Sequence, residues 1–157
     1  MSASTNPIPQ EQPGTLDQAL SYQAVLNVLA DVCHAIDSHD GAAWAALYTD
    51  DGVFAYAPAP GTDNLFELVG REALVAWHVH HRSTTPVGKQ NHLTLNPVVT
   101  VTGDTATSRS YFVSLREVDG AVVPASTGRY EDRLRRDADG RWRLSCRLAI
   151  GDMPRRS

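Results

Sequence analysis

Apolar positions near the start of the chain recur at the three- and four-residue spacing of a helix that buries one face. This spacing runs from Leu16 to Ile36. Thr15 and Gln18 form the Thr-x-x-Gln pattern that is typical of a helix N-terminus. The pattern therefore predicts a first helix that ends at about residue 39.

The next fifty residues predict two shorter helices around one strand. Residues 41–48 form the second helix, a turn follows at 50–52, and residues 53–56 read as a strand. A loop rich in proline and glycine, 58–64, then leads to a third helix over residues 71–82.

From residue 90 onward the pattern changes to long strand-like runs that are separated by turn dipeptides. The runs are 90–102, 105–117, 121–136 and 141–150, and the dipeptides are Gly103-Asp104, Asp119-Gly120 and Asp139-Gly140. Short turns join antiparallel neighbours, and strands of this length bend. We expect an α+β domain in which a cone-shaped, curved antiparallel sheet wraps around three N-terminal helices and encloses one pocket.

Length and composition indicate a single globular domain. We expect it to cover residues 15–151 of the 157, between a polar tail at 1–14 that does not read as a secretory signal and a short tail at 152–157. Charged residues make up 20% of the chain and its net charge is −4, which argues against binding to nucleic acid. No apolar run is long enough to cross a membrane, so we expect a cytoplasmic protein without a membrane partner.

The residues that bind cofactors and metals in other proteins do not form recognisable motifs here. Cys33 and Cys146 lack the spacing of a metal or redox pair, so we interpret them as two buried thiols. His78, His80 and His81 lack a carboxylate or thiol to complete a metal site, and we expect an exposed or pocket-rim helix face there. Without a glycine-rich phosphate loop or a nucleophile elbow, we expect neither a cofactor nor a metal.

Asp37 and His92 are the candidates for acid–base chemistry. Asp37 follows Cys33 by one helical turn, so its carboxylate either lies in a pocket with a partner or caps the helix end. An imidazole beside a carboxylate is a good general base near neutral pH. The two residues would form such a dyad if the sheet folds over the first helix.

The side of the sheet on which His92 lies is open at this stage. Alternation along residues 90–102 places Leu93, Leu95, Val99 and Val101 on one face and His92 on the other. The face that carries His92 is then either exposed to solvent or the wall of a pocket, because an open sheet permits both arrangements.

Aromatic residues are candidates for the pocket wall, with plain core packing as the alternative for each of them. These residues are Trp44, Tyr48, Tyr56, Trp77 and Tyr111. Tyr56 ends a predicted strand beside the proline- and glycine-rich loop, where its phenol could contact a ligand oxygen.

Several segments, taken in order, resemble the SnoaL-like domains of the nuclear-transport-factor-2-like superfamily. The resemblance covers residues 16–151 and rests on order and spacing rather than on one motif. Its segments are residues 37–40, 44–54, 70–74, 92–106, 128–132 and 139–144, together with Arg147.

The resemblance implies a pocket enzyme. The superfamily includes scytalone dehydratase, steroid isomerases and polyketide cyclases, and its dehydratase branch uses an aspartate late in the first helix with a histidine on the sheet. Asp37 and His92 fall on those two positions, and Tyr56 falls near that of a pocket tyrosine. The tyrosine expected near the aspartate is replaced by Val32 and Ile36, and a second pocket histidine is absent, which argues against scytalone as the substrate.

The residues and the resemblance together predict a cofactor-independent lyase or isomerase for a small, apolar, polyketide-, terpene- or steroid-like molecule. His92 would be the base, Asp37 would orient it, and Tyr56 would polarise an oxygen, with Arg147 as a further candidate. The alternatives are a non-catalytic subunit similar to dioxygenase β subunits, or a ligand-binding protein. Apolar residues on the outward strand faces favour a homodimer or homotrimer.

Overall fold

The computed structural model describes residues 14–38, 40–84 and 90–152. Its elements are α1 (Leu16–Asp37), α2 (Gly41–Ala46), β1 (Tyr48–Ala57), β2 (Phe66–Val69), α3 (Arg71–Ser83), β3 (Gln90–Thr102), β4 (Thr105–Val118), β5 (Ala121–Arg136) and β6 (Trp142–Gly151). The two predicted tails lie almost wholly outside the described residues. The predicted helices and the long strands agree with these bounds to within a few residues.

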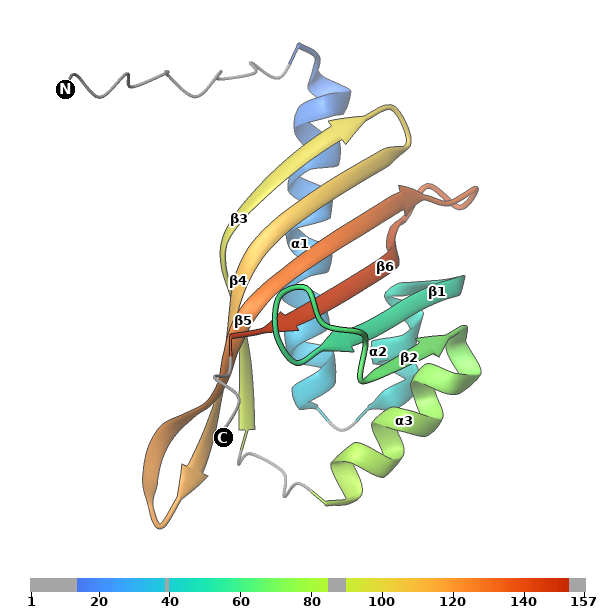
Figure 1. Ribbon diagram of the computed structural model, residues 1–157. Coiled ribbons are helices and arrows are strands. Elements are labelled where there is room, and N and C mark those ends of the chain that lie inside the picture. Colours follow the sequence, from blue (N-terminus) through green and yellow to red (C-terminus); the bar gives the residue numbers. More distant parts are fainter. Residues whose placement is uncertain (1–13, 39, 85–89, 153–157) are drawn as a thin grey trace, which may run out of the picture.

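The six strands form one open sheet in the order β2-β1-β6-β5-β4-β3 (Figure 1). The predicted meander from β3 to β6 is confirmed, and each of its consecutive pairs is antiparallel. The predicted α+β fold is confirmed, but the sheet is mixed rather than antiparallel throughout, because β1 lies parallel to β6. Short turns determine only the pairing of strands that follow each other in the sequence, and β1 and β6 are far apart in the sequence.

The structure has the start of β1 where the sequence predicts the end of a helix and a turn. The helix α2 ends at Ala46, and β1 runs from Tyr48 through residues 50–52, with a register shift before Val53. A Cβ at Gly52 would lie 2.8 Å from the Cβ of Tyr48, so only glycine fits this irregular stretch. Pairing with β6 thus outweighs the local turn preference, and it places Tyr48 in the core.

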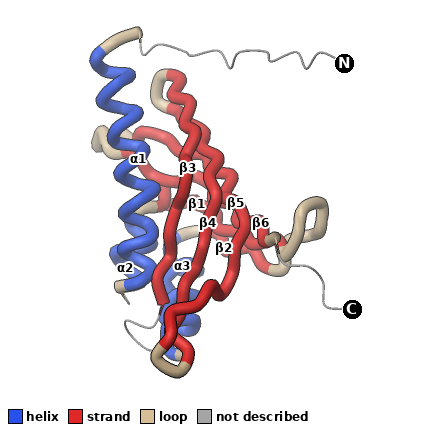
Figure 2. Tube along the Cα trace, turned by 90° about the vertical axis from the view of Figure 1, so that its left-hand side faces the viewer, coloured by secondary structure: helices blue, strands red, loops and turns tan. Residues whose placement is uncertain are grey.

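The helix α1 lies along one face of the sheet, where it packs on β3 and β6 (Figure 2). It is long and apolar enough to span a membrane by length and composition, yet Val25, Leu29 and Val32 are buried in the domain core. The shorter helices α2 and α3 pack on each other, and α3 also packs on β1 and β2. The C-terminal end of α1 therefore lies inside the curve of the sheet, close to the start of β3.

A β-bulge interrupts β3 in its middle. The pairing of β3 with β4 shifts register between Leu95 and Val98, and Asn96 adopts a φ of 51°. Pro97 has no backbone N–H to donate to the neighbouring strand, so the regular ladder cannot continue through this position.

The bulge reverses the faces of the strand. Before it, His92 is directed inward while Leu93 and Leu95 are exposed; after it, Val99 and Val101 pack against the core. The prediction that all these apolar residues share one face is therefore wrong. One extra residue in the strand shifts the inward–outward alternation of the side chains by one position. His92 therefore points inward before the bulge, and Val99 and Val101 point inward after it.

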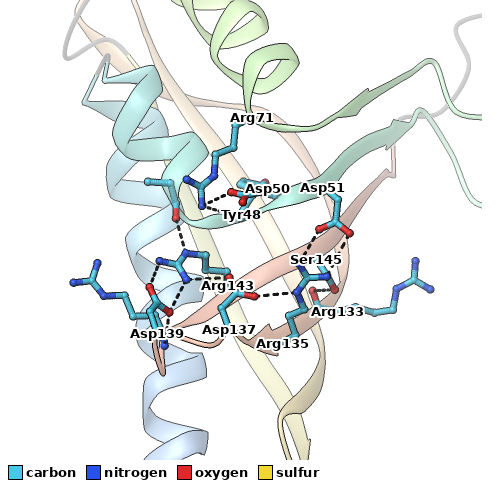
Figure 3. Close-up of polar contacts among 12 residues, drawn as sticks. Tyr48, Asp50, Asp51, Arg71, Arg133, Arg135, Asp137, Asp139, Arg143 and Ser145 are labelled. Carbon is cyan, nitrogen blue, oxygen red and sulfur yellow. Dashed lines mark hydrogen bonds and ion pairs between the residues drawn. The ribbon is translucent and has the colours of Figure 1, made fainter.

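A network of ion pairs ties the β5–β6 hairpin to β1 (Figure 3). Arg143 contacts Asp137 at 2.9 Å and Asp139 at 2.7 Å, and Arg135 contacts Asp51 of β1 at 2.9 Å. Most of these carboxylates are largely exposed, where an ion pair contributes little to stability. We interpret this network as a structural tie at the surface.

Candidate active site

Asp37 and His92 meet where the end of α1 approaches the start of β3. The Nδ1 of His92 lies 2.7 Å from Oδ1 of Asp37, and the backbone N–H of His92 donates to Oδ2 at 2.9 Å. An ionised carboxylate only accepts hydrogen bonds, so this contact keeps the proton on Nδ1 and leaves Nε2 as the basic atom. The two side chains are 14% and 17% exposed, so the dyad is reachable from solvent.

A second set of contacts holds the dyad from the side of α3. The Nη2 of Arg82 donates to the backbone oxygen of Asp37 at 3.4 Å, and its Nη1 donates to Oε1 of Gln90 at 3.3 Å. The amide of Gln90 lies 3.5 Å from Nε2 of His92. Sequence reasoning missed Arg82 and Gln90, because nothing in their local pattern links the end of α3 to the dyad.

A small cavity of about 20 Å³, partly open to solvent, lies between α1, α2 and the sheet. Most of its wall is apolar, and His92 of the dyad is one of the residues that line it. Its lining residues are Val32, Cys33, Ile36, Trp44, Tyr48, Phe54, His92, Tyr130 and Arg147. A cavity of this size has room for about one water molecule, so a ligand binds here only if the side chains of the wall move apart.

Arg147, a predicted substrate contact, lines this cavity but is held by Asp132. Its Nε and Nη2 donate to the two carboxylate oxygens at 2.8 and 3.0 Å, and both residues are buried. Burial lowers the pKa of Arg147 and the Asp132 carboxylate raises it, with a net rise. The guanidinium also lies 4.0 Å from the ring centroid of Tyr130. Sequence reasoning missed Asp132, although its alternation within β5 directs it inward.

Trp44 and Tyr48, both predicted pocket residues, line the inner part of the cavity. Their ring centroids are 5.3 Å apart in an edge-to-face arrangement. The Nε1 of Trp44 and the hydroxyl of Tyr48 are buried without a hydrogen-bond partner among the described residues. Burial raises the pKa of the Tyr48 phenol, so it stays protonated and can donate a hydrogen bond.

Tyr111 does not line the cavity, and its prediction as a pocket residue is wrong. It is 60% exposed on the outer face of β4, while its neighbour Phe112 is buried. Successive residues of a strand point to opposite faces. The type of residue alone did not reveal which of the two aromatic side chains points inward.

Trp77 and Tyr56 pack beside the cavity rather than in its lining. Trp77 lies against Trp44, with ring centroids 5.6 Å apart, and belongs to the aromatic packing under α3. Tyr56 stacks on Phe66 of β2 at 5.9 Å, and its hydroxyl lies against Gly151. The structure therefore does not bring Tyr56 to the cavity wall beside His92.

The three histidines of α3 do not share one environment. His78 is fully buried, with Nε2 3.3 Å from the backbone oxygen of Ile36, so the prediction of an exposed or rim position is wrong for it. His81 stacks on Trp77 at 4.7 Å, and burial lowers its pKa. Among the described residues, no group of three or more histidine, cysteine or acidic side chains could hold a metal.

The buried thiol of Cys33 lines the cavity close to the dyad. Its Sγ lies 3.2 Å from Oγ1 of Thr94, and burial raises its pKa, so it is held as a neutral thiol. Cys146 is half-buried rather than buried. A neutral thiol in this position is a wall group rather than a nucleophile.

The geometry can therefore support proton transfer. A basic nitrogen lies at an accessible cavity wall, a carboxylate orients it, and apolar side chains limit the access of water. A base of this kind can take a proton from a molecule that binds against the wall.

Comparisons with known proteins agree with this architecture. The sequence profile of the SnoaL-like domain family matches residues 17–147. The structure of Rv3472, a protein of unknown function from Mycobacterium tuberculosis, is 29% identical with a TM-score of 0.78, covering 92% of this chain and 80% of that chain. A nuclear-transport-factor-2-like protein with a cystatin-like fold from Novosphingobium aromaticivorans is 26% identical with a TM-score of 0.70, covering 92% and 95%.

A third structure shares the fold alone. This protein, from Novosphingobium aromaticivorans, is described as the β subunit of an aromatic-ring-hydroxylating dioxygenase. It is 22% identical to this chain. Its TM-score is 0.74, and the match covers 88% of this chain and 94% of that chain. No match is found among curated protein sequences.

Proposed function

The chain belongs to the SnoaL-like family, and from that premise we propose that it is a cofactor-independent cytoplasmic enzyme. It moves a proton on a small, mostly apolar, polyketide-, terpene- or steroid-like molecule. Because one fold hosts many functions, the site rather than the fold indicates the activity. It is carried by the 2.7 Å contact between Asp37 and His92 beside an apolar cavity.

The proposed reaction begins with removal of a proton from carbon next to a carbonyl or a leaving group. Nε2 of His92 accepts this proton, and the Asp37 carboxylate stabilises the imidazolium that forms. In a dehydration the imidazolium returns the proton to the departing hydroxyl, which leaves as water. In an isomerisation it returns the proton to a different atom of the same molecule. In a cyclisation the carbanion attacks a second carbonyl carbon of the same molecule, the C=O π bond opens to an alkoxide, and the imidazolium protonates that oxygen.

The test of this proposal follows proton exchange, which does not depend on knowing the product. The wild type and the Asp37→Asn and His92→Gln variants are incubated in D₂O with a metabolite extract. Mass spectrometry then detects compounds that gain deuterium or change in mass. We expect the wild type to label or convert a compound, and each variant to do so roughly 100-fold or more slowly.

Matched controls separate chemistry from folding. Asp31→Asn and His34→Gln change the same residue types at exposed positions of α1, and we expect both to keep full activity. If the wild type and the two dyad variants label the same compounds at the same rate, the proposal is wrong. A compound that binds tightly and stays unchanged would instead indicate a ligand-binding protein.

A second candidate function is that of a non-catalytic subunit. It is supported by the likeness in fold to the dioxygenase β subunit, which extends over most of both chains. Under this hypothesis the protein would co-purify with a larger Rieske-type partner, and the Asp37→Asn variant would assemble as well as the wild type.

A further inference from the structure

We infer that Arg82 and Gln90 are positioning residues of the dyad, which together keep Nε2 of His92 unprotonated. Arg82 fixes the direction of the Gln90 amide, and the amide then presents a hydrogen-bond donor to the imidazole. The inference deepens the proposed function, on which it rests, because it says how the base is kept ready to accept a proton.

The first observation is the direction of the Gln90 amide. The Nη1 of Arg82 donates to Oε1 of Gln90 at 3.3 Å, and a guanidinium can only donate hydrogen bonds. The oxygen end of the amide therefore faces Arg82, which is only 5% exposed. The NH₂ end is left for the imidazole, and its nitrogen lies 3.5 Å from Nε2 of His92.

The second observation is what this amide end can offer to the imidazole. An amide NH₂ group donates hydrogen bonds and does not accept them, whereas an imidazolium carries N–H on both ring nitrogens. A proton on Nε2 of His92 would face the NH₂ group of Gln90 without an acceptor. A hydrogen bond to the neutral form disfavours the charged form, so the contact favours the imidazole with its proton on Nδ1.

The third observation is that Arg82 also holds the end of the helix that carries Asp37. The last carbonyl groups of a helix have no partner within it. Here the Nη2 of Arg82 donates to the backbone oxygen of Asp37 at 3.4 Å, and Nε2 of His78 lies 3.3 Å from that of Ile36. A cation at this end of α1 also suits the helix dipole. One buried side chain of α3 thus contacts both elements that build the dyad.

The charged groups around the ring act in opposite directions. The carboxylate of Asp37, on α1, favours a proton on the imidazole. The guanidinium groups of Arg82, on α3, and of Arg147, on β6, oppose a second positive charge, and Arg147 lines the same cavity as His92. The amide of Gln90 adds to the groups that oppose it.

The other titratable groups on this side of the sheet add no negative charge. Burial raises the pKa of three residues that line the cavity, so these stay neutral: Cys33, Tyr48 and Tyr130. On α3, burial first and the neighbouring cations second lower the pKa of His81. Asp37 is therefore the group that the amide of Gln90 has to balance.

The test measures the protonation of the His92 ring, which ¹⁵N NMR of protein with labelled histidine reports for each nitrogen separately. His92→Gln identifies the signals by their loss. Gln90→Glu, Gln90→Met and Arg82→Met are compared with the wild type at one near-neutral pH. Arg141→Met, which changes an exposed arginine, is the control.

We expect the wild type to show a protonated Nδ1 and an unprotonated Nε2. Gln90→Glu replaces the donor by an acceptor, so both ring nitrogens should be protonated at the same pH. Gln90→Met removes the donor and Arg82→Met releases the amide. Each should raise the ratio of protonated to neutral His92 by roughly 3- to 10-fold, the effect of one lost hydrogen bond. Arg141→Met should behave as the wild type does.

Three results would overturn the inference. These are an imidazolium in the wild type, an unprotonated Nε2 in Gln90→Glu, or an unchanged ratio in Gln90→Met. A purely structural role would lower the free energy of unfolding and leave the ratio unchanged. If Arg82→Met fails to fold, the two variants of Gln90, which is half-buried on the edge strand β3, still decide the outcome.

The same experiment separates this inference from the proposed function, because the protonation of the ring is measured without a substrate. A wild type that labels no compound in D₂O but shows the expected ring signals and variant shifts would overturn the proposed function alone. A wild type that labels a compound while Gln90→Glu keeps an unprotonated Nε2 would overturn the roles of Arg82 and Gln90 alone.

Discussion

At the scale of single residues, the site depends on which polar groups are paired and which are not. Arg147 is buried and donates two hydrogen bonds to the carboxylate of Asp132, so its charge is already paired within the protein. Asp37 uses both carboxylate oxygens on His92. The hydroxyl of Tyr48, in contrast, is buried without a hydrogen-bond partner among the described residues.

The pair of Asp132 and Arg147 gives a prediction about stability. Asp132→Ala leaves a buried cation without its partner, and we expect the free energy of unfolding to fall by roughly 3–5 kcal/mol. Asp104→Ala removes a partner of Arg136 at an exposed position and should cost less than about 1 kcal/mol. Urea unfolding of both variants checks this. Equal losses would contradict the assignment of Asp132 as a structural partner.

At the scale of elements, the bulge in β3 is the feature that positions the base. The segment before Asn96 directs His92 toward α1, and the segment after it directs Val99 and Val101 into the core. A regular strand could bury His92 or these valines, but not both, because alternation has a period of two. The bulge thus serves packing and the candidate site at once.

Asn96 allows this role to be tested. Its φ of 51° is one that asparagine and glycine adopt readily and β-branched residues do not. We expect Asn96→Gly to change the free energy of unfolding little and Asn96→Val to lower it by roughly 1–2 kcal/mol. Chemical denaturation measures both, and the NMR signal of the His92 Nδ1 proton reports the dyad. A fully stable Asn96→Val variant would show that the bulge is not strained.

At the scale of the whole molecule, the sheet has an inner face that holds the site and an outer face that is partly apolar. Leu95 of β3 lies directly opposite Tyr111 of β4 on that outer face, and both side chains are largely exposed. A hollow lies on the sheet near them, lined by residues that include Val98, Arg109 and Leu148. Apolar surface in one patch is typical of an interface between protein molecules.

This patch gives a prediction about assembly. We expect the wild type to be a homodimer or homotrimer and the Leu95→Lys variant to shift toward monomer, because a charge would have to be buried at the interface. Val79→Lys changes an exposed apolar residue of α3 and should leave the assembly unchanged. Size-exclusion chromatography with light scattering measures the mass. A monomeric wild type would contradict the prediction.

The sequence by itself determined the elements that depend on near neighbours. The helical spacing in α1 and α3 and the turn dipeptides between β3 and β6 act over a few residues, so their bounds agree closely with the structure. The candidacy of Asp37 and His92 also came from the sequence, through residue type, position in an element and a family resemblance. The contact between them joins residues 55 positions apart, and only the fold brings them together.

The tertiary structure decided every feature that depends on distant pairing. It placed β1 parallel to β6 and extended β1 to Tyr48. It also reversed the inward and outward faces of β3 at the bulge. It also directed Tyr48 into the cavity and Tyr111 toward solvent, although both are tyrosines in strands. The reason is physical: hydrogen bonds between remote strands and the burial of one face depend on the whole chain, whereas local patterns constrain only neighbours.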